Sequence, residues 1–270
     1  MADKLYKYLD SNGGIAMLNN KTLQFTNATQ LNDPFDCHPA FVDLSPDASG
    51  LYHGIPADFY SQMEYQKGLN RRDKTYICSL SKVYASILMW SYYSKHSGVC
   101  IGLDMEKTRK YLNRMTGLIL GCSELEVQYW DVINVHNTVA NSNDFLCYHF
   151  ATKAKEWQHE QEVRLVAYDP SPKYMRLLPW QYKNESFCEK AKHFFHKQKK
   201  EDNIIPWKEV RAFLDIGGEC FESVYLGINI GKKEKDNIIK VARKSNHEIN
   251  IYQMTIDPEA FRLKEELIEQ

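Results

Sequence analysis

The chain has 270 residues, of which 43% are hydrophobic and 26% are charged, and this composition is typical of a globular protein rather than a disordered or fibrous one. Its 34 basic and 35 acidic side chains give a formal net charge of −1, so no global field attracts it to nucleic acid or to an anionic membrane. The sequence has neither a signal-peptide core nor an apolar run that could span a bilayer, so we expect a soluble chain with no membrane partner.

Cysteine and aromatic residues carry the remaining compositional information. Seven cysteines are spread along the chain without a CxxC pair, which favours reduced thiols in the cytoplasm over a disulfide framework or a zinc site. The 17 Tyr, 12 Phe and 5 Trp suit either a thick core or a cleft that stacks planar ligands. Composition alone does not separate these two uses.

Alternating and helical patterns predict the elements in chain order. In the first half of the chain we expect a strand at 4–9, a helical turn at 14–19, a strand at 22–25, a helix at 57–67, a strand at 75–80, a helix at 85–95, a strand at 98–103, a helix at 105–115 and a strand at 125–133. In the second half we expect a helix at 142–156, a strand at 162–168, a helix at 185–199, strands at 210–214 and 224–230, a helix at 232–244 and a strand at 248–254. Strands interrupted by helices at irregular intervals predict a mixed α+β fold.

The segment EQEVRLVAY, residues 160–168, is the most informative strand. Alternation along a strand predicts that Glu160, Glu162 and Arg164 share one face. Two carboxylates this close repel each other, so we expect a raised pKa in at least one of them unless Arg164 or solvent compensates. In a cleft, a fixed carboxylate would stabilise a developing positive charge. On a solvated sheet face the same residues would form only a surface ion pair, and this alternative stays open.

The loop LNDPFDCHP, residues 31–39, contains the turn-forming residues Asn32 and Asp33, and Phe35 could anchor it in the core. It is either a structural turn or a rigid loop that presents Asn32 or Asp36 to a ligand. The sequence does not choose between the two.

The strand at 75–80 leads to two hydroxyl side chains, Ser79 and Ser81, which could hold a ligand amide or hydroxyl. The helix that follows is expected to pack through Leu88, Met89 and Tyr92, since such a stripe is more often core than ligand cage. The sequence contains no GxSxG elbow, no GxGxxG and no GxxxxGK motif.

Two late segments are basic. Residues 190–200, KAKHFFHKQKK, hold five lysines and no acid around two phenylalanines: Lys190, Lys192, Lys197, Lys199 and Lys200. Lysines interleaved with aromatic rings can bind single-stranded nucleic acid, although such runs are more often solvated helix faces. The predicted helix at 232–244 carries six basic residues and two acidic ones.

Six segments together resemble a known family. LYKY, LNDPFDC, CSLS, LMWSYYSKHSGVCIGLD, WQHEQEVRL and VYLGINI occur in this order in a widespread bacterial family, domain of unknown function 2971, and the resemblance covers nearly the whole chain. The family label implies no activity.

A second resemblance does imply one. EQEVRLVAY is similar to the ExE strand of ADP-ribosyltransferases, and its order after a basic-aromatic strand and a hydroxyl-rich strand resembles the three-part signature of that superfamily. The first position, usually Arg or His, is taken here by Lys7 or Tyr8. The resemblance implies one ADP-ribosyltransferase-like domain over 1–270, with a split β-sheet core flanked by helices and a C-terminal strand–helix–strand extension from about residue 210.

The same resemblance implies roles for individual residues, with NAD as the substrate and no metal. Glu162 would bond the nicotinamide ribose and stabilise an oxocarbenium-like transition state, and Glu160 would orient or deprotonate the acceptor. The implied NAD-binding residues are Lys7, Tyr8, Asn32, Ser79, Ser81, Tyr92, Tyr93 and Arg164.

Our leading hypothesis is a cytoplasmic, NAD-dependent ADP-ribosyltransferase, a bacterial toxin or phage-defence effector that modifies nucleic acid in preference to protein and is held by an antitoxin or inhibitor protein. It requires Glu162, Ser79 and Lys7 or Tyr8 to line one cleft. The first alternative is a non-catalytic module that keeps the fold and binds a nucleotide or a partner protein. It is favoured if Glu160 and Glu162 pair with core-side basic groups or face bulk solvent. The second alternative is a metal-free nuclease or hydrolase.

Overall fold

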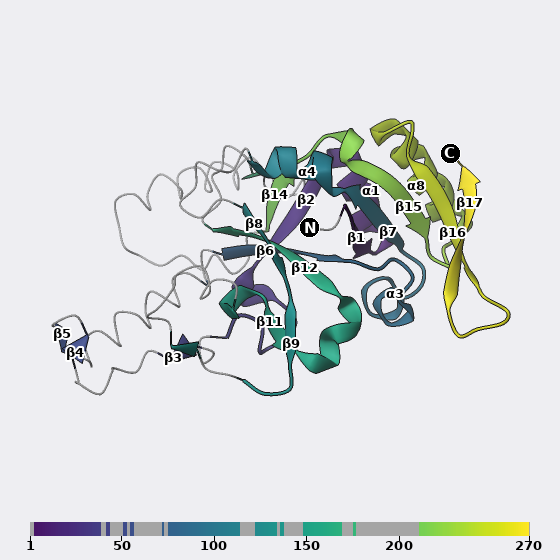
Figure 1. Cartoon of the computed structure of the whole chain (residues 1–270). Helices are drawn as coiled ribbons and strands as arrows, with labels where there is room; N and C mark the ends of the chain where they lie inside the picture. Colours follow the sequence, from purple (N-terminus) through teal and green to yellow (C-terminus); the bar gives the residue numbers. More distant parts are fainter. Residues whose placement is uncertain are drawn as a thin grey trace.

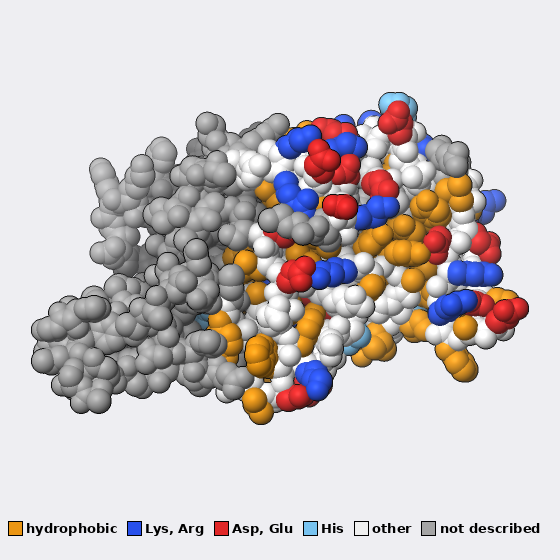
Figure 2. Space-filling view, in the orientation of Figure 1, with side chains coloured by type: hydrophobic (Ala, Val, Ile, Leu, Met, Phe, Trp, Pro, Cys, Tyr) orange, Lys and Arg blue, Asp and Glu red, His pale blue; other side chains and the backbone are white. Residues whose placement is uncertain are grey.

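The computed structural model describes residues 3–38, 42–43, 51–52, 55–56, 72, 75–113, 122–133, 136–137, 148–168, 175–176 and 211–269. An 11-stranded sheet with helices packed against it forms the body of this part of the chain (Figure 1), so the predicted mixed α+β class is confirmed. Acidic and basic side chains are interspersed over the visible described surface (Figure 2). None of the described helices is long and apolar enough to cross a membrane.

The large sheet has the order β13-β14-β2-β6-β1-β7-β15-β16-β17, and β12 and β8 branch from β6. Its strands are β1 (Lys4–Leu9), β2 (Thr22–Asn27), β6 (Thr75–Ser81), β7 (Val99–Asp104), β8 (Cys122–Glu126), β12 (Glu162–Tyr168), β13 (Met175–Arg176), β14 (Ala212–Asp215), β15 (Phe221–Leu226), β16 (Asn250–Ile256) and β17 (Leu263–Glu269). Strands of the region after residue 210 therefore pair within the same sheet as the N-terminal strands.

Short elements complete the described fold. Three two-stranded sheets pair β3 (Val42–Asp43) with β10 (His136–Asn137), β4 (Leu51–Tyr52) with β5 (Ile55–Pro56), and β9 (Gln128–Trp130) with β11 (Thr152–Ala154). The helices are α1 (Ser11–Asn20), α3 (Ile87–Ser94), α4 (Met105–Leu112) and α8 (Lys232–Ser245), and the 3-10 helices are η1 (Ala28–Gln30), η4 (Lys155–Glu160) and η6 (Gly218–Cys220).

Strand β6 is the hub of the sheet. Along one edge it pairs with β12 over its whole length, from Glu162 opposite Ser81 to Tyr168 opposite Thr75. Along the other edge it pairs with β2 near its start, and with β1 at the single position Tyr6 opposite Ser81. Because β1 instead forms six consecutive pairs with β7, β1 and β6 diverge and the sheet splits between them.

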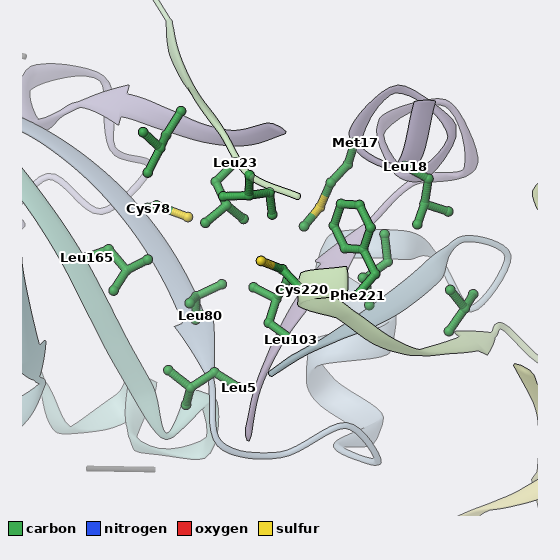
Figure 3. Close-up of a cluster of buried hydrophobic side chains, with 14 of the residues drawn as sticks. Leu5, Met17, Leu18, Leu23, Cys78, Leu80, Leu103, Leu165, Cys220 and Phe221 are labelled. Atoms are coloured by element: carbon green, nitrogen blue, oxygen red, sulfur yellow. The ribbon is translucent and has the colours of Figure 1, made fainter. Parts of the chain in front are cut away.

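Both faces of the sheet are covered. The larger core cluster, which includes Leu5, Leu18, Leu103 and Phe221, packs the sheet against α1 and α8 (Figure 3). A second cluster includes Tyr6, Tyr8, Met89, Trp90 and Tyr225 and packs α3 against the opposite face. Alternation along β1 explains this arrangement, since successive side chains enter different clusters. Four cysteines whose side chains the structure describes, Cys37, Cys78, Cys100 and Cys220, are buried free thiols.

Several sequence expectations need correction. The predicted helix at 142–156 is wrong over its described C-terminal end, because residues 152–154 form strand β11 and a 3-10 helix follows. The predicted strand at 125–133 is two strands, β8 and β9. Phe35 is exposed rather than an anchor, and helix α3 buries Met89 and Trp90 while Leu88 and Tyr92 are exposed. The predicted helices at 57–67 and 185–199 lie outside the described residues.

Candidate functional site

A pocket opens where β1 and β6 diverge. Its cavity volume is about 150 Å³, which is close to that of an engineered cavity that binds a single benzene ring. Eight of the ten predicted catalytic and NAD-binding residues line it: Lys7, Tyr8, Asn32, Ser79, Ser81, Tyr93, Glu160 and Glu162. The pocket therefore brings together side chains from β1, β6, α3 and β12 and from the loop after η1.

Glu162 lies at the start of β12 and is buried. Arg164 donates from Nε to Oε1 of Glu162 at 2.9 Å and from a terminal nitrogen to Oε2 at 3.1 Å, and Lys153 Nζ donates to Oε2 at 3.3 Å. Burial opposes ionisation, but Arg164 and Lys153 outweigh it and lower the pKa of Glu162 to about 2. The expected repulsion from Glu160 therefore does not raise the pKa of Glu162, which is a fixed anion.

Arg164 lies behind Glu162, outside the lining of the pocket. It is 1% exposed, and its guanidinium donates to Asp36 Oδ1 at 2.7 Å and to the carbonyl of Phe150 at 3.0 Å as well as to Glu162. Burial disfavours its charge, yet Glu162 and Asp36 raise the pKa of Arg164 above its ordinary value. The loop residue Asp36 and the strand residue Glu162 are thus joined through one buried cation.

Lys153 on β11 is a site residue that the sequence analysis missed. It is buried, and its Nζ donates to Glu160 Oε2 at 2.5 Å and lies 4.7 Å from the centroid of the Trp157 ring. Burial disfavours the ammonium form, but Glu162 and Glu160 raise the pKa of Lys153. The signal that could have found it is its position seven and nine residues before two acids, in KAKEWQHEQE.

Glu160 reaches the same cluster from a different element than predicted. It ends the 3-10 helix η4, and Gln161 at φ 43° turns the chain before β12 begins, so Glu160 and Glu162 do not share a strand face. Its side chain is nevertheless buried, which overturns the solvated-face alternative. Burial and Glu160 raise the pKa of Tyr93, whose hydroxyl donates to Glu160 Oε1 at 2.5 Å.

The two serines have distinct partners. Ser81 Oγ donates to the carbonyl of Glu160 at 2.7 Å, and a side-chain hydrogen bond with Ser79 helps to keep Glu162 ionised. Across the split in the sheet, Lys7 Nζ donates to the carbonyl of Ser79 at 2.8 Å. Lys7 therefore bridges a point where β1 and β6 form no backbone pair.

The buried charges beside the pocket do not balance. Five charged side chains are buried together: Asp36, Glu160, Glu162, Lys153 and Arg164. Three acids and two bases give this cluster a formal charge of −1. Lys7 also lines the pocket, so with its ammonium the formal charges around the pocket balance, and the group that would stabilise a positive charge there is Glu162 itself. Among the described residues, no three His, Cys, Asp or Glu side chains are grouped so that they could hold a metal ion.

One predicted site residue lies outside the pocket, and one predicted group lies outside the described residues. Tyr92 is 58% exposed and does not line the pocket; its ring lies 6.5 Å from that of Trp157 and 5.8 Å from that of His159, centroid to centroid. The predicted nucleic-acid contacts Lys190, Lys192, Lys197, Lys199 and Lys200 lie outside the described residues.

Comparison with protein families gives one match. Residues 89–165 match the family described as "Protein of unknown function (DUF2971)", which confirms the expected family resemblance over this segment. The matched segment contains Tyr93, Lys153, Glu160, Glu162 and Arg164. The remaining parts of the pocket, from β1, β6 and the loop after η1, come from outside it. Comparisons with curated proteins and with solved structures find no significant match.

Proposed function

We propose that the protein is an NAD-dependent ADP-ribosyltransferase that acts in the cytoplasm on a macromolecule. The supporting observation is that β1, β6 and β12 lie side by side in the sheet, and that Lys7, Ser79 and Glu162 from these strands line one pocket. These are the three strands of the signature that the sequence resembles. Each comes from a distant part of the chain, so their convergence is a property of the fold.

The chemistry fits the charge of the site. Cleavage of the nicotinamide glycosidic bond passes through an oxocarbenium-like transition state, and a fixed carboxylate in a water-poor site stabilises that cation. Glu162 stays ionised above a pH of about 2 and is held in place by Arg164 at 2.9 Å. Glu160, next to Tyr93, orients or deprotonates the acceptor.

The pocket has room for one ring. A volume of about 150 Å³ admits a group of the size of nicotinamide but not a whole dinucleotide. We therefore infer that nicotinamide enters between Tyr8 and Tyr93, and that the rest of NAD lies outside, where the ammonium of Lys7 meets the pyrophosphate.

Labelled NAD tests the proposal directly. The parent protein, incubated with adenylate-labelled NAD and bacterial extract, is expected to transfer label and to release nicotinamide. Glu162→Gln should lower both rates about 100-fold or more. Glu126→Gln, on the neighbouring strand β8 and paired with exposed Lys82, is the matched control and should match the parent. Absence of label transfer and of nicotinamide release by the folded parent would contradict the proposal.

The acceptor is identified by digestion of the labelled product. We favour nucleic acid because of the lysines in residues 190–200. Nuclease should then remove the label and protease should not, and substitution of these lysines by Ala should weaken transfer while leaving NAD hydrolysis intact. A toxin or defence role predicts that expression of the parent, but not of Glu162→Gln, arrests bacterial growth, and that a partner antitoxin or inhibitor protein relieves it.

A second candidate is a module that binds a nucleotide without turning it over. The observation in its favour is that Glu160 and Glu162 both pair with Lys153, and Glu162 also with Arg164. It predicts that NAD or a fragment of it raises the melting temperature of the parent while no nicotinamide is released. The same two measurements, ligand binding and nicotinamide release, therefore separate the two functions.

A further inference from the structure

The C-terminal hairpin of β16 and β17 presents an aromatic side chain at its tip. Phe261 is 105% exposed, so no described part of the chain packs on it, and Ile256 at the base of the turn is 67% exposed. The hairpin extends from one end of the sheet, and hydrophobic side chains lie exposed around its tip (Figures 1 and 2). A fully exposed Phe beside other exposed apolar groups is typical of a contact surface.

The turn that carries Phe261 is held rigidly. Asp257 is buried and accepts hydrogen bonds from the backbone N–H of Glu259 at 3.0 Å and from Arg262 Nε at 2.5 Å. The backbone N–H of Asp257 also donates to the carbonyl of Arg262 at 3.1 Å. Because the turn is already ordered, little conformational entropy is lost when Phe261 is bound.

An open groove lies at the base of the same hairpin, between the start of α8 and the end of β16. Its apolar lining comes from Ile228, Ile230, Met254 and Ile256, and its charged lining from Lys232, Lys235 and Asp236. The groove is open to solvent and has a volume of about 700 Å³. The groove can therefore accept a phenylalanine side chain together with part of its turn.

The charges of the two features are complementary. Residues 256–268 of the hairpin carry four acidic and two basic side chains, a formal charge of −2. Helix α8, which forms one wall of the groove, carries six basic and two acidic side chains, a formal charge of +4. The same chain thus contains an apolar projection on an acidic hairpin and an apolar groove beside a basic helix.

We propose that the protein forms a two-fold symmetric dimer in which Phe261 of each protomer occupies the groove of the other. A second copy is the occupant because one chain supplies both complementary parts, and because full exposure of Phe261 means that it does not fill its own groove. Two-fold symmetry uses both pairs of surfaces and closes the assembly, whereas a one-way contact would continue into a filament.

Sedimentation equilibrium of the full chain tests the role of Phe261 in the dimer. The parent should dimerise in the micromolar range, and Phe261→Ser should raise the dissociation constant tenfold or more. Leu88→Ser, an exposed apolar position on α3, is the matched control and should leave the dissociation constant unchanged. Since Phe261 packs on no described part of its own chain, Phe261→Ser should keep the parent's unfolding midpoint. A parent that stays monomeric, or a dimer that is indifferent to Phe261→Ser, overturns the proposal.

Charge exchange tests the two-fold arrangement. Two double variants are made: one carries Lys232→Glu and Lys233→Glu on α8, and the other carries Glu259→Lys and Glu266→Lys on the hairpin. Each should weaken self-association, because the hairpin of one protomer then meets like charges on α8 of the other. An equimolar mixture of the two double variants should restore a dimer that contains one chain of each kind. Failure of the mixture to associate, or growth of the parent into open polymers, overturns the two-fold dimer. NAD turnover does not enter these measurements, so their outcome is independent of the proposed enzymatic function.

Discussion

Arg164 occupies one of the least favourable places for a charge, fully inside the protein. Moving ions out of water costs several kcal/mol each, and the attraction within a buried pair offsets this only when every donor and acceptor is satisfied. Arg164 meets that condition through Glu162, Asp36 and a backbone carbonyl. Well-packed apolar residues would often serve stability as well, so the cluster of Arg164 with four other charged residues favours a functional requirement for the carboxylates it holds.

Lys153 should matter far more than its neighbour Lys155. Lys153→Met leaves Glu160 and Glu162 without a shared buried cation, and we expect a loss of about 3–5 kcal/mol in the free energy of unfolding. Lys155 pairs with Asp131 in solvent, so Lys155→Met should leave the urea midpoint close to that of the parent. Urea unfolding followed by circular dichroism measures both, and equal effects of the two substitutions would contradict a role for Lys153 in holding the cluster.

Glu162 also makes stability depend on pH. Its pKa is about 2 in the folded protein against an ordinary value of 4.5, so the unfolded chain binds the proton more readily. The stabilisation, about 3 kcal/mol, is therefore complete above pH 4.5 and is lost as the pH falls towards 2. The difference in unfolding free energy between the parent and Glu162→Gln should shrink between pH 6 and pH 3. A difference that is constant over this range would show that Glu162 is not held as an anion.

The sequence predicts most of this site but not how its charges are compensated. Glu162 and Ser79 follow from a strand pattern and a resemblance, because both depend on local order along the chain. Lys153 does not, because a single lysine in a predicted helix is usually solvated and its burial depends on strand β9 pairing beside it. The sequence of the loop does not choose between Asn32 and Asp36 as the residue that it presents, and only the fold shows that Arg164 pairs with Asp36.

At the scale of the elements, the residue before β7, Gly98, lies too close to β1 and α3 to carry a side chain. A Cβ on Gly98 would lie 2.2 Å from the carbonyl oxygen of Leu9 and 2.8 Å from Ser94 Cβ. Gly98→Ala should therefore force β1 and β7 apart and lower the free energy of unfolding by about 1–3 kcal/mol or more. Because β1 supplies Lys7 to the pocket, the same substitution should weaken binding of any ligand there.

Gly13→Ala is the matched control for Gly98→Ala. Gly13 lies in the first turn of helix α1, and the nearest contact of an added Cβ would be at 3.1 Å to Asp10 Oδ1, the N-cap oxygen that accepts from the Gly13 N–H. Alanine is favoured over glycine in a helix by up to about 1 kcal/mol, which offsets that contact. Thermal unfolding should separate the two variants clearly, and a loss at Gly13 equal to that at Gly98 would argue against the close approach of β1 and β7.

Elements with a clear local pattern are predicted with accurate bounds. Strands β1 and β12 have the ends expected from the sequence because their side chains alternate or form a continuous apolar run. The 142–156 segment has helix-compatible residues, but Thr152 and Lys153 are buried in a parallel pair with β9. Pairing with a distant strand therefore overrides local preference, and a single sequence carries no record of that pairing.

On the scale of the whole molecule, stability should be greatest around β6. This strand pairs with β12 along one edge and with β2 and β1 along the other. Strand β17 lies at the end of the described sheet and pairs there with β16. We expect amides of residues 75–81 to exchange with solvent only through global unfolding and those of residues 263–269 to exchange much faster. Hydrogen exchange with mass spectrometry measures both segments, and similar rates in the two would contradict β6 as the centre of the fold.

The contacts that build the pocket also determine when it can form during synthesis of the chain. Arg164 reaches Asp36 across 128 sequence positions, and Lys7 reaches Ser79 across 72. Contacts between such distant positions form only after long loops have closed, which slows folding. A nascent chain therefore has no complete pocket until residue 164 has left the ribosome and β12 has paired with β6.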